Sequence, residues 1–265
     1  MKIFIYTNCQ GGAFEKLLPR LVDRDLSITF VENYKVINGD VALEVAQEAA
    51  KSADIFIYQP LGVEHGPRST ERGAEDTIGS LVSKRSLRVS MPYIYNDALW
   101  PLFEDGPKIR NEDVIIDLVK LGAEPADILE MYDQGKIDWR FDARFINTDR
   151  ILREKEADLD IKVADVISQN LKLSPVMLTQ NHPCSVVFSS VLTQFLSIAG
   201  WMKVSASDRL EEWTRVDTNI AELPGRWPTD RYAVQHYRFD YDAKIDEWAH
   251  EFYRSLVQKV LLLTP

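Results

Sequence analysis

Short apolar runs alternate with helical patterns over the first ninety residues. The runs are rich in Ile, Phe, Val and Tyr and are too short for buried helices, so they predict strands at 2–6, 27–31, 54–58 and 87–91. Between them, apolar residues recur at helical spacing and predict helices over 10–24, 41–52 and 75–84. This alternation predicts a parallel, doubly wound sheet with helices on both faces.

The rest of the chain is mainly helical in pattern. No strand is predicted over 111–171, and we interpret about 106–172 as a helical insertion. A fifth strand is predicted at 175–179, followed by a buried helix over 184–200. Residues from about 203 to 265 form a C-terminal helical extension, which closes with an amphipathic helix. The prediction is one three-layer α/β domain over 1–265.

The composition narrows the function classes. The chain has 265 residues and a net charge of −10, which argues against nucleic-acid binding because that requires a basic surface. No apolar stretch approaches the roughly 18 residues of a membrane span. The apolar run near residue 1 is too short for a signal peptide. We therefore expect a cytoplasmic protein whose two cysteines are reduced. The oligomeric state stays open.

Cys9 lies on the polar turn that ends the first predicted strand. A strand that breaks into a helix places this turn at the carboxyl edge of the sheet, where open α/β folds bind ligands. The positive helix N-terminus favours a thiolate, and the N–H groups of Cys9 and Gln10 could donate to an oxyanion. Asn8 and Gln10 flank the cysteine and extend this polar site. The alternative is a small buried thiol without a chemical role.

His182 follows the predicted fifth strand within Asn181-His182-Pro183. If that strand belongs to the same parallel sheet, His182 and Cys9 leave the sheet at one edge, and we expect them to meet there. A neutral imidazole could then take a proton from a thiol or a sugar hydroxyl. Thr179 stands three residues earlier, so Asn181, a backbone carbonyl or Asp97 would have to orient the ring. The alternative is a structural histidine.

Other residues near the expected edge complete the candidate site. Gln59 ends the third strand and is a candidate oxyanion donor. The irregular aromatic stretch containing Tyr95, Asn96 and Asp97 is interpreted as a pocket wall. Arg68 and Arg72 are either surface charges or clamps for phosphates. A metal site would use Cys9, His65, His182 and Cys184, and a disulfide switch would join Cys9 to Cys184. Their spacing matches no standard zinc pattern, so no metal is expected.

These motifs together resemble the WcbI family of polysaccharide biosynthesis proteins. The family's Gly-Asn-Cys-Gln turn appears as Thr7-Asn8-Cys9-Gln10, its aromatic middle motif as Tyr93–Pro101, and its late His-Pro as His182-Pro183. The resemblance covers roughly residues 1–200. The family is similar in turn to SGNH-type esterases, in which a serine occupies the position of Cys9 and an aspartate that of Thr179.

The resemblance implies a coenzyme A-dependent acyltransferase of capsular or surface polysaccharide biosynthesis. Acetyl-coenzyme A would be the donor and a hydroxyl of a sugar or polysaccharide precursor the acceptor. His182 either activates Cys9 as a nucleophile or deprotonates the acceptor directly while Cys9 lines the pocket. Two alternatives remain open: an SGNH-like esterase or thioesterase, and a coenzyme A-binding protein without catalysis.

Overall fold

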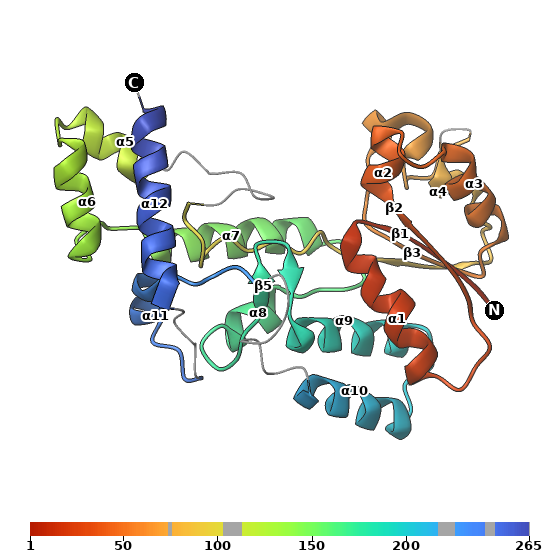
Figure 1. Cartoon of the computed structure of the whole chain (residues 1–265). Coiled ribbons are helices and arrows are strands. Elements are labelled where there is room, and N and C mark those ends of the chain that lie inside the picture. The colour runs from red at the N-terminus through yellow and green to blue at the C-terminus, as the bar shows by residue number, and fades with distance from the viewer. Residues whose placement is uncertain (74–75, 103–112, 217–225, 242–246, 265) are drawn as a thin grey trace. The chain divides into compact units, whose positions relative to one another are not determined.

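The computed structural model describes residues 1–73, 76–102, 113–216, 226–241 and 247–264 (Figure 1). The chain divides into two compact units, each of which is described by itself. Unit 1 comprises Met1–Tyr93, Arg153–Val166 and Ser185–Asp217. Unit 2 comprises Ile94–Leu152, Ile167–Cys184 and Thr218–Pro265. The predicted single domain over 1–265 stays a prediction.

A parallel sheet forms the centre of unit 1. Its strands are β1 (Lys2–Thr7), β2 (Ser27–Glu32), β3 (Ile55–Tyr58) and β4 (Leu87–Ser90), in the order β2-β1-β3-β4. All three strand pairs are parallel, which confirms the predicted α/β sheet. The central strands β1 and β3 are almost wholly apolar because helices cover both of their faces.

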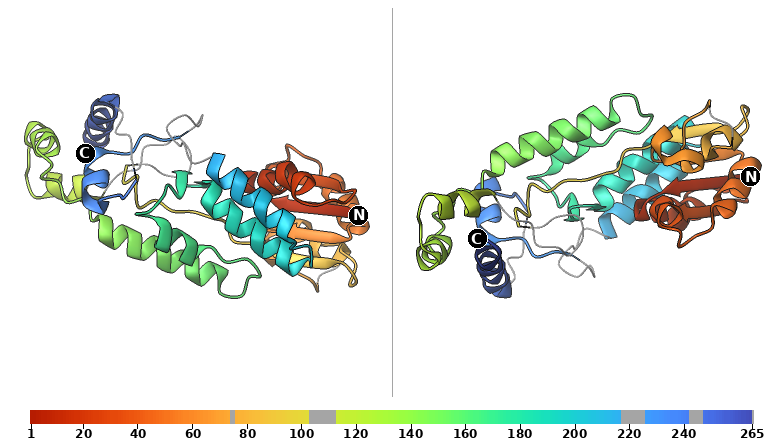
Figure 2. Two further views of the ribbon diagram at one scale, coloured as in Figure 1. Left: turned by 90° about the horizontal axis from the view of Figure 1, so that it is seen from below. Right: turned by 90° about the horizontal axis from the view of Figure 1, so that it is seen from above.

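Helices lie on both faces of this sheet (Figures 1 and 2). On one face, Phe4, Tyr6 and Phe56 form a buried cluster with apolar residues of the covering helices. On the other face, the ring of Phe14 contacts that of Phe195 edge-on, at 5.5 Å between centroids. The first face carries α2 (Asn33–Asn38), α3 (Leu43–Ser52) and α4 (Ile78–Leu81). The second carries α1 (Gly12–Leu21), α9 (Ser185–Ile198) and α10 (Val204–Val216).

Part of the predicted helical insertion returns to the sheet of unit 1. The amide and hydroxyl of Ser90, at the end of β4, donate to the Asp160 carboxylate at 2.8 and 2.7 Å. The Ile161 amide donates to the Ser90 carbonyl at 3.1 Å. The inserted region also holds α7 (Phe141–Glu156) and α8 (Ala164–Asn170). Irregular chain therefore satisfies the polar groups at the end of β4.

The predicted fifth strand is wrong as a member of the parallel sheet. Residues of β5 (Met177–Thr179) pair antiparallel with β6 (His182–Pro183) in a separate two-stranded sheet within unit 2. A hairpin turn at Gln180 and Asn181 brings the two short strands together. His182 therefore stands on a hairpin, and the shared-edge argument for its meeting with Cys9 does not hold.

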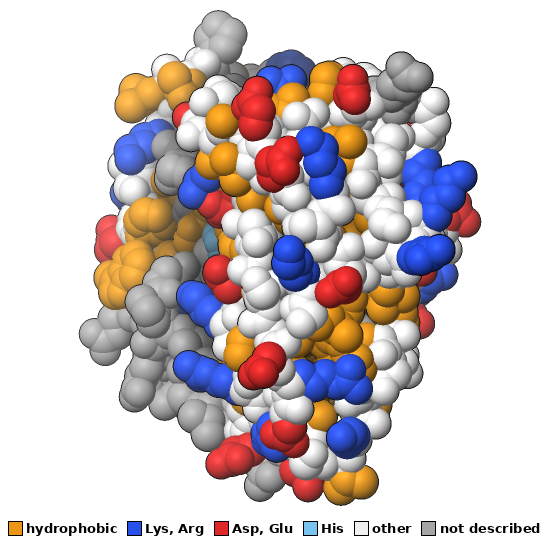
Figure 3. All heavy atoms as spheres, turned by 90° about the vertical axis from the view of Figure 1, so that its right-hand side faces the viewer, with side chains coloured by type: hydrophobic (Ala, Val, Ile, Leu, Met, Phe, Trp, Pro, Cys, Tyr) orange, Lys and Arg blue, Asp and Glu red, His pale blue; other side chains and the backbone are white. Residues whose placement is uncertain are grey.

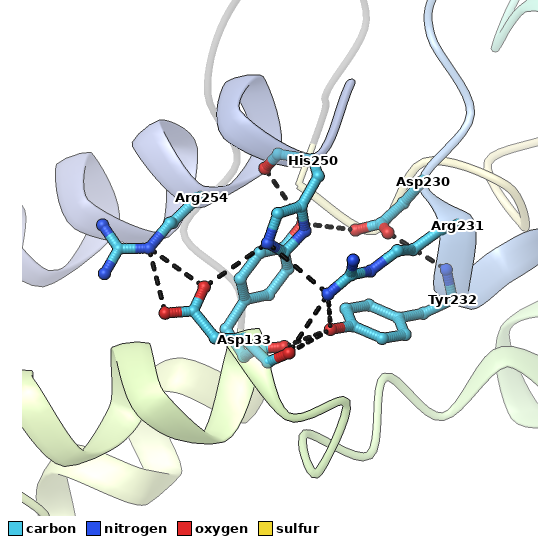
Figure 4. A network of polar contacts seen from close by, with 7 residues as sticks. Asp133, Asp230, Arg231, Tyr232, His250 and Arg254 are labelled. Atoms are coloured by element: carbon cyan, nitrogen blue, oxygen red, sulfur yellow. Dashed lines mark hydrogen bonds and ion pairs between the residues drawn. The ribbon is translucent and has the colours of Figure 1, made fainter. Parts of the chain in front are cut away.

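A polar network that is buried at Tyr132 and Asp230 joins helices of unit 2 (Figure 4). The Tyr132 hydroxyl donates to the Asp230 carboxylate at 2.9 Å, and the His250 ring stacks on the Tyr132 ring at 5.1 Å. Arg254 pairs with Asp133 at 2.9 Å. The helices of this unit include α5 (Asp113–Lys120), α6 (Pro125–Asp133), α11 (Arg231–Tyr237) and α12 (Glu247–Leu263). The network fixes α12 against α6 through directional contacts as well as apolar burial.

One face of the molecule mixes both signs of charge. Acidic and basic side chains are interspersed on the face seen in Figure 3, with apolar side chains between them. Within the described ranges, no helix has the length and apolar character needed to cross a membrane.

Candidate active site

The turn carrying Cys9 is built at the carboxyl end of β1. After Thr7 the chain enters a short 3-10 helix, η1 (Cys9–Gly11), which leads directly into α1. The Asn8 side chain caps this helix by accepting the Gln10 amide at 3.0 Å. Gly11 is required for the packing, because a Cβ there would lie 2.1 Å from Thr7 Oγ1. The turn thus brings Cys9 close above the sheet edge.

The environment of Cys9 favours the neutral thiol. Burial raises the pKa of this half-buried thiol, and the nearby Glu32 carboxylate raises it further. Hydrogen bonds from the backbone N–H groups of Cys9 and Gln10 lower the pKa but do not outweigh these effects. The expected bias toward thiolate at the helix N-terminus is therefore wrong, because desolvation and a like charge exceed the backbone contribution.

Glu32 is a site residue that the sequence reasoning missed. It is the last residue of β2 and is paired in register with Thr7, which places it beside the Cys9 turn. Its carboxylate accepts the Tyr34 hydroxyl at 3.0 Å and forms an ion pair with Lys35. The signal was an acidic residue at the end of a predicted strand next to the first one.

Replacing Glu32 with glutamine should lower the pKa of the Cys9 thiol. The substitution removes the negative charge and frees the Lys35 ammonium, and both changes favour thiolate. We expect iodoacetamide to alkylate Cys9 roughly threefold faster at neutral pH, because the thiolate is the reactive form. Site-mapped mass spectrometry measures the rate. Glu44→Gln, an exposed change in the first turn of α3, is the matched control. An unchanged or slower rate in Glu32→Gln would contradict this electrostatic account.

Gln59 lies beside the Cys9 turn, as the sequence predicted. Its side chain is only 4% exposed and follows β3 at the same edge of the sheet. The Gln59 carboxamide accepts the Asn8 amide at 2.8 Å and approaches the Gln10 side-chain oxygen at 3.1 Å. Unit 1 therefore brings together Asn8, Cys9, Gln10 and Gln59.

The two candidate arginines have different environments. Arg68 ends the 3-10 helix η2 (Val63–Arg68), is half-buried and donates from Nε to the Val36 carbonyl at 3.0 Å. It also acts electrostatically on Tyr6, although burial dominates there and raises the pKa of Tyr6 to about 12. Arg72 is exposed and donates to the Ser83 carbonyl at 3.3 Å. Phosphate binding by either arginine stays a prediction.

In unit 2, the hairpin holds the imidazole of His182. Thr179 Oγ1 lies 2.7 Å from His182 Nδ1 and donates to Asn181 Oδ1 at 3.1 Å. A hydroxyl whose proton is used on Asn181 accepts from Nδ1–H, and this tautomer leaves Nε2 as the base. The ring is solvent-exposed, yet the surrounding protein removes part of its hydration and lowers the pKa of His182. In a Ser-His-Asp triad the aspartate binds Nδ1 of the histidine. Here Thr179 contacts that nitrogen of His182.

The aromatic stretch is tied to this same hairpin within unit 2. The Asn96 amide donates to the Gln180 carbonyl at 2.8 Å, and the buried Asn96 side chain accepts the Ala98 amide at 3.1 Å. Tyr95 and Asp97, both partly buried, flank Asn96. Unit 2 therefore brings Asn96 and its neighbours near the His182 hairpin, while the meeting of Cys9 and His182 stays a prediction.

The metal alternative gains no support from side-chain clustering. Over the described parts of the chain, no group of three or more His, Cys, Asp or Glu residues is placed to hold a metal ion. Cys184 is buried beside the hairpin, and its amide donates to the Val176 carbonyl at 2.9 Å.

Comparison with known proteins identifies the family. A sequence model described as polysaccharide biosynthesis enzyme WcbI matches residues 2–203. The chain belongs to the WcbI family. The match includes both the Cys9 turn and the His182 hairpin. No match is found among curated proteins.

A solved WcbI structure shares the fold. It matches with a TM-score of 0.59 and 15% sequence identity, and the alignment covers 98% of each chain. That structure is described as native WcbI, a novel polysaccharide biosynthesis enzyme, without a disulfide bond between coenzyme A and one of its cysteines. At this identity the likeness supports the fold of the WcbI-family chain and not the role of any single residue.

Proposed function

We infer that this WcbI-family chain transfers an acetyl group from acetyl-coenzyme A to a sugar hydroxyl of a surface or capsular polysaccharide precursor. The observation that carries the proposal is the half-buried Cys9 sulfur on a sharp turn at the carboxyl edge of a parallel sheet, with backbone N–H groups directed at it. Ligands of open α/β folds bind at this edge. The related solved protein is described by the absence of a disulfide bond between coenzyme A and one of its cysteines, and this pairing of coenzyme A with a cysteine supports a coenzyme A thioester as the donor.

In the covalent route, His182 Nε2 takes the thiol proton and Cys9 Sγ attacks the thioester carbonyl carbon. An S–C bond forms while the carbonyl becomes an oxyanion, and the bond to the coenzyme A sulfur then breaks. The leaving thiolate takes the proton back from His182. A sugar hydroxyl, deprotonated by the same imidazole, attacks the acyl-cysteine and regenerates the thiol. This route requires a base because Cys9 rests as a thiol.

In the direct route, His182 deprotonates the sugar hydroxyl, which attacks the donor carbonyl itself. Cys9 then only lines the donor pocket. Arg68 is the better placed of the two arginines for a phosphate of coenzyme A, because its half-buried guanidinium is held by the Val36 carbonyl. In either route Tyr95, Asn96 and Asp97 are proposed to line the site beside His182.

Intact mass after mixing with acetyl-coenzyme A distinguishes the two routes. The covalent route predicts that wild-type protein gains the mass of one acetyl group and that Cys9→Ala gains none. Cys184→Ala is the matched control, because it removes the second thiol and should still form the adduct. Coenzyme A release without an adduct in this mixture, which contains no sugar acceptor, would indicate hydrolysis. Absence of both the adduct and coenzyme A release would contradict the covalent route, because the direct route releases coenzyme A only after a sugar acceptor is added.

A further inference from the structure

The side chain of Gln59 connects three strands at the edge that carries Cys9. Its Oε1 accepts the amide of Asn8, which follows β1, at 2.8 Å. Its Nε2 lies 3.2 Å from the carbonyl of Pro92, which follows β4. Because Gln59 itself follows β3, one buried carboxamide extends the hydrogen bonding of the sheet beyond the ends of β1, β3 and β4.

Backbone donors fix the orientation of both amides in this network. The Asn8 N–H must face an oxygen, so Oε1 of Gln59 points to it and Nε2 points away. The Gln10 N–H likewise requires Oδ1 of Asn8 at 3.0 Å. Nε2 of Gln59 then donates to that same Oδ1 at 3.2 Å. The backbone N–H groups therefore determine which side-chain atom of Asn8 and Gln59 is oxygen and which is nitrogen, although the two atoms look alike in shape.

Two consequences follow for oxyanion stabilisation. The protons of Gln59 Nε2 are directed at acceptors of the turn itself, with Asn8 Oδ1, Gln10 Oε1 and the Pro92 carbonyl all within 3.2 Å. The amino group of Asn8 is turned away from them, and it has no hydrogen-bond partner among the described residues. Asn8 immediately precedes Cys9 and is partly exposed. Its Nδ2 is therefore the available donor of this network.

We propose that Gln59 is a positioning residue that holds the Asn8 carboxamide so that Asn8 Nδ2 donates to the oxyanion formed on a substrate attacked by Cys9. The inference rests on the proposed acyl chemistry of Cys9. When Sγ forms its bond to the carbonyl carbon, the electron pair of the carbonyl moves to oxygen. A donor that is already fixed stabilises this charge without reorganisation. Gln59 acts through Asn8 and does not itself touch the substrate.

Two reactions of the same thiol separate this role from a structural one. Acylation of Cys9 by p-nitrophenyl acetate passes through a tetrahedral oxyanion and releases p-nitrophenolate. Alkylation by iodoacetamide is a direct displacement of iodide and forms no oxyanion. Loss of thiol exposure or a shifted thiol pKa changes both rates, whereas loss of an oxyanion donor changes acylation alone. The ratio of the two rates at Cys9, mapped by peptide mass spectrometry, is therefore the readout.

Asn8→Ser and Gln59→Met are the informative variants. Serine keeps a capping oxygen for the Gln10 amide but lacks Nδ2, and we expect the acylation-to-alkylation ratio to fall roughly 10²-fold. Gln59→Met leaves the Asn8 carboxamide held only by the Gln10 amide, and we expect a roughly tenfold fall. The double variant should be no worse than Asn8→Ser, because Gln59 acts only through Asn8. Gln47→Met, which removes an amide on α3, is the matched control and should keep the wild-type ratio.

Each outcome bears on the inference. A ratio that stays at the wild-type value in Asn8→Ser, or rates that fall in parallel, would overturn it. Effects of the two substitutions that multiply in the double variant would overturn the dependence on Asn8. A wild-type Cys9 that neither ester nor thioester acylates would overturn both this inference and the covalent route of the proposed function. Acylation by the nitrophenyl ester with no reaction of acetyl-coenzyme A would count against the proposed function alone.

Discussion

Replacing His182 with alanine is expected to lower the consumption of acetyl-coenzyme A about 10³-fold, since a positioned general base contributes roughly 10² to 10⁴. The dependence on a base is strong here because burial and Glu32 keep Cys9 as a thiol. Coenzyme A release measures the rate. His236→Gln, which changes another histidine of unit 2 that pairs with Asp142, is the matched control and should retain wild-type activity.

The pH dependence of the rate provides a second test of His182→Ala. Desolvation lowers the pKa of His182, so the neutral base persists to more acidic pH than for an ordinary histidine. The wild-type rate should therefore fall with acid only below the ordinary value of about 6.5, and His182→Ala should lose this acid limb. Thr179→Val keeps the shape of the side chain but removes its contact with Nδ1, so an intermediate loss is expected. Full activity in His182→Ala would exclude the imidazole as the base.

The reactivity of the Cys9 thiol tests whether Cys9 and His182 lie close together. If the imidazole lies beside the sulfur, His182→Ala should change the pH dependence of Cys9 alkylation by iodoacetamide, because a neighbouring titrating group alters the thiolate fraction. A profile identical to wild type would place the two groups out of electrostatic reach. That result would leave Cys9 chemistry possible but would remove His182 from it.

The sheet of unit 1 could be predicted because its signal is local. The four apolar runs of the first ninety residues became parallel strands at nearly the predicted positions. The runs that became the central strands β1 and β3 are buried on both faces, so almost every residue in them is apolar. The turn at Cys9 followed from the same pattern, since polar residues directly after such a run mark the edge of the sheet.

The hairpin of His182 could not be predicted from its pattern. The run over 175–179 reads as one more buried strand, but only Met177–Thr179 pairs, and its partner comes from the next few residues. In a strand of three residues the alternation of apolar and polar positions is too short to indicate which strand it pairs with. The helix α2 was missed because Asn33–Asn38 mixes polar and apolar residues over fewer than two turns.

Within the candidate site, it was easier to predict which residues lie there than what each side chain does. Gln59 was expected to donate to an oxyanion, whereas its amide protons face acceptors of the Cys9 turn. Glu32 was not considered, because its effect on Cys9 depends on the pairing of β1 with β2. Both roles are set by side-chain geometry between neighbouring strands, which a single sequence does not encode in any local pattern.

Asp230→Ala is expected to destabilise unit 2 by about 3 kcal/mol, the combined cost of a lost helix cap and an unsatisfied buried hydroxyl. Asp230 is 2% exposed and caps α11 by accepting the Tyr232 amide at 3.0 Å. Its other oxygen accepts the Tyr132 hydroxyl at 2.9 Å (Figure 4). Alanine removes this acceptor from both donors and leaves the Tyr132 hydroxyl only the weaker contact with the His250 carbonyl at 3.4 Å. Hydrogen exchange of α6 and α11, followed by mass spectrometry, measures the loss locally.

The pH dependence of this stability has a definite sign. Burial raises the pKa of Asp230, and the hydrogen bonds from Tyr232 and Tyr132 offset only part of that increase. The folded state therefore binds the proton more tightly than the unfolded chain, so this contribution is full below the unfolded pKa of about 3.9 and is lost as pH rises through the folded pKa. Asp230→Asn keeps a capping oxygen and cannot titrate, so its stability should change less with pH over this range. A wild-type protein whose stability rose relative to Asp230→Asn as pH increased would show instead that the ionised carboxylate is the favoured partner of Tyr132.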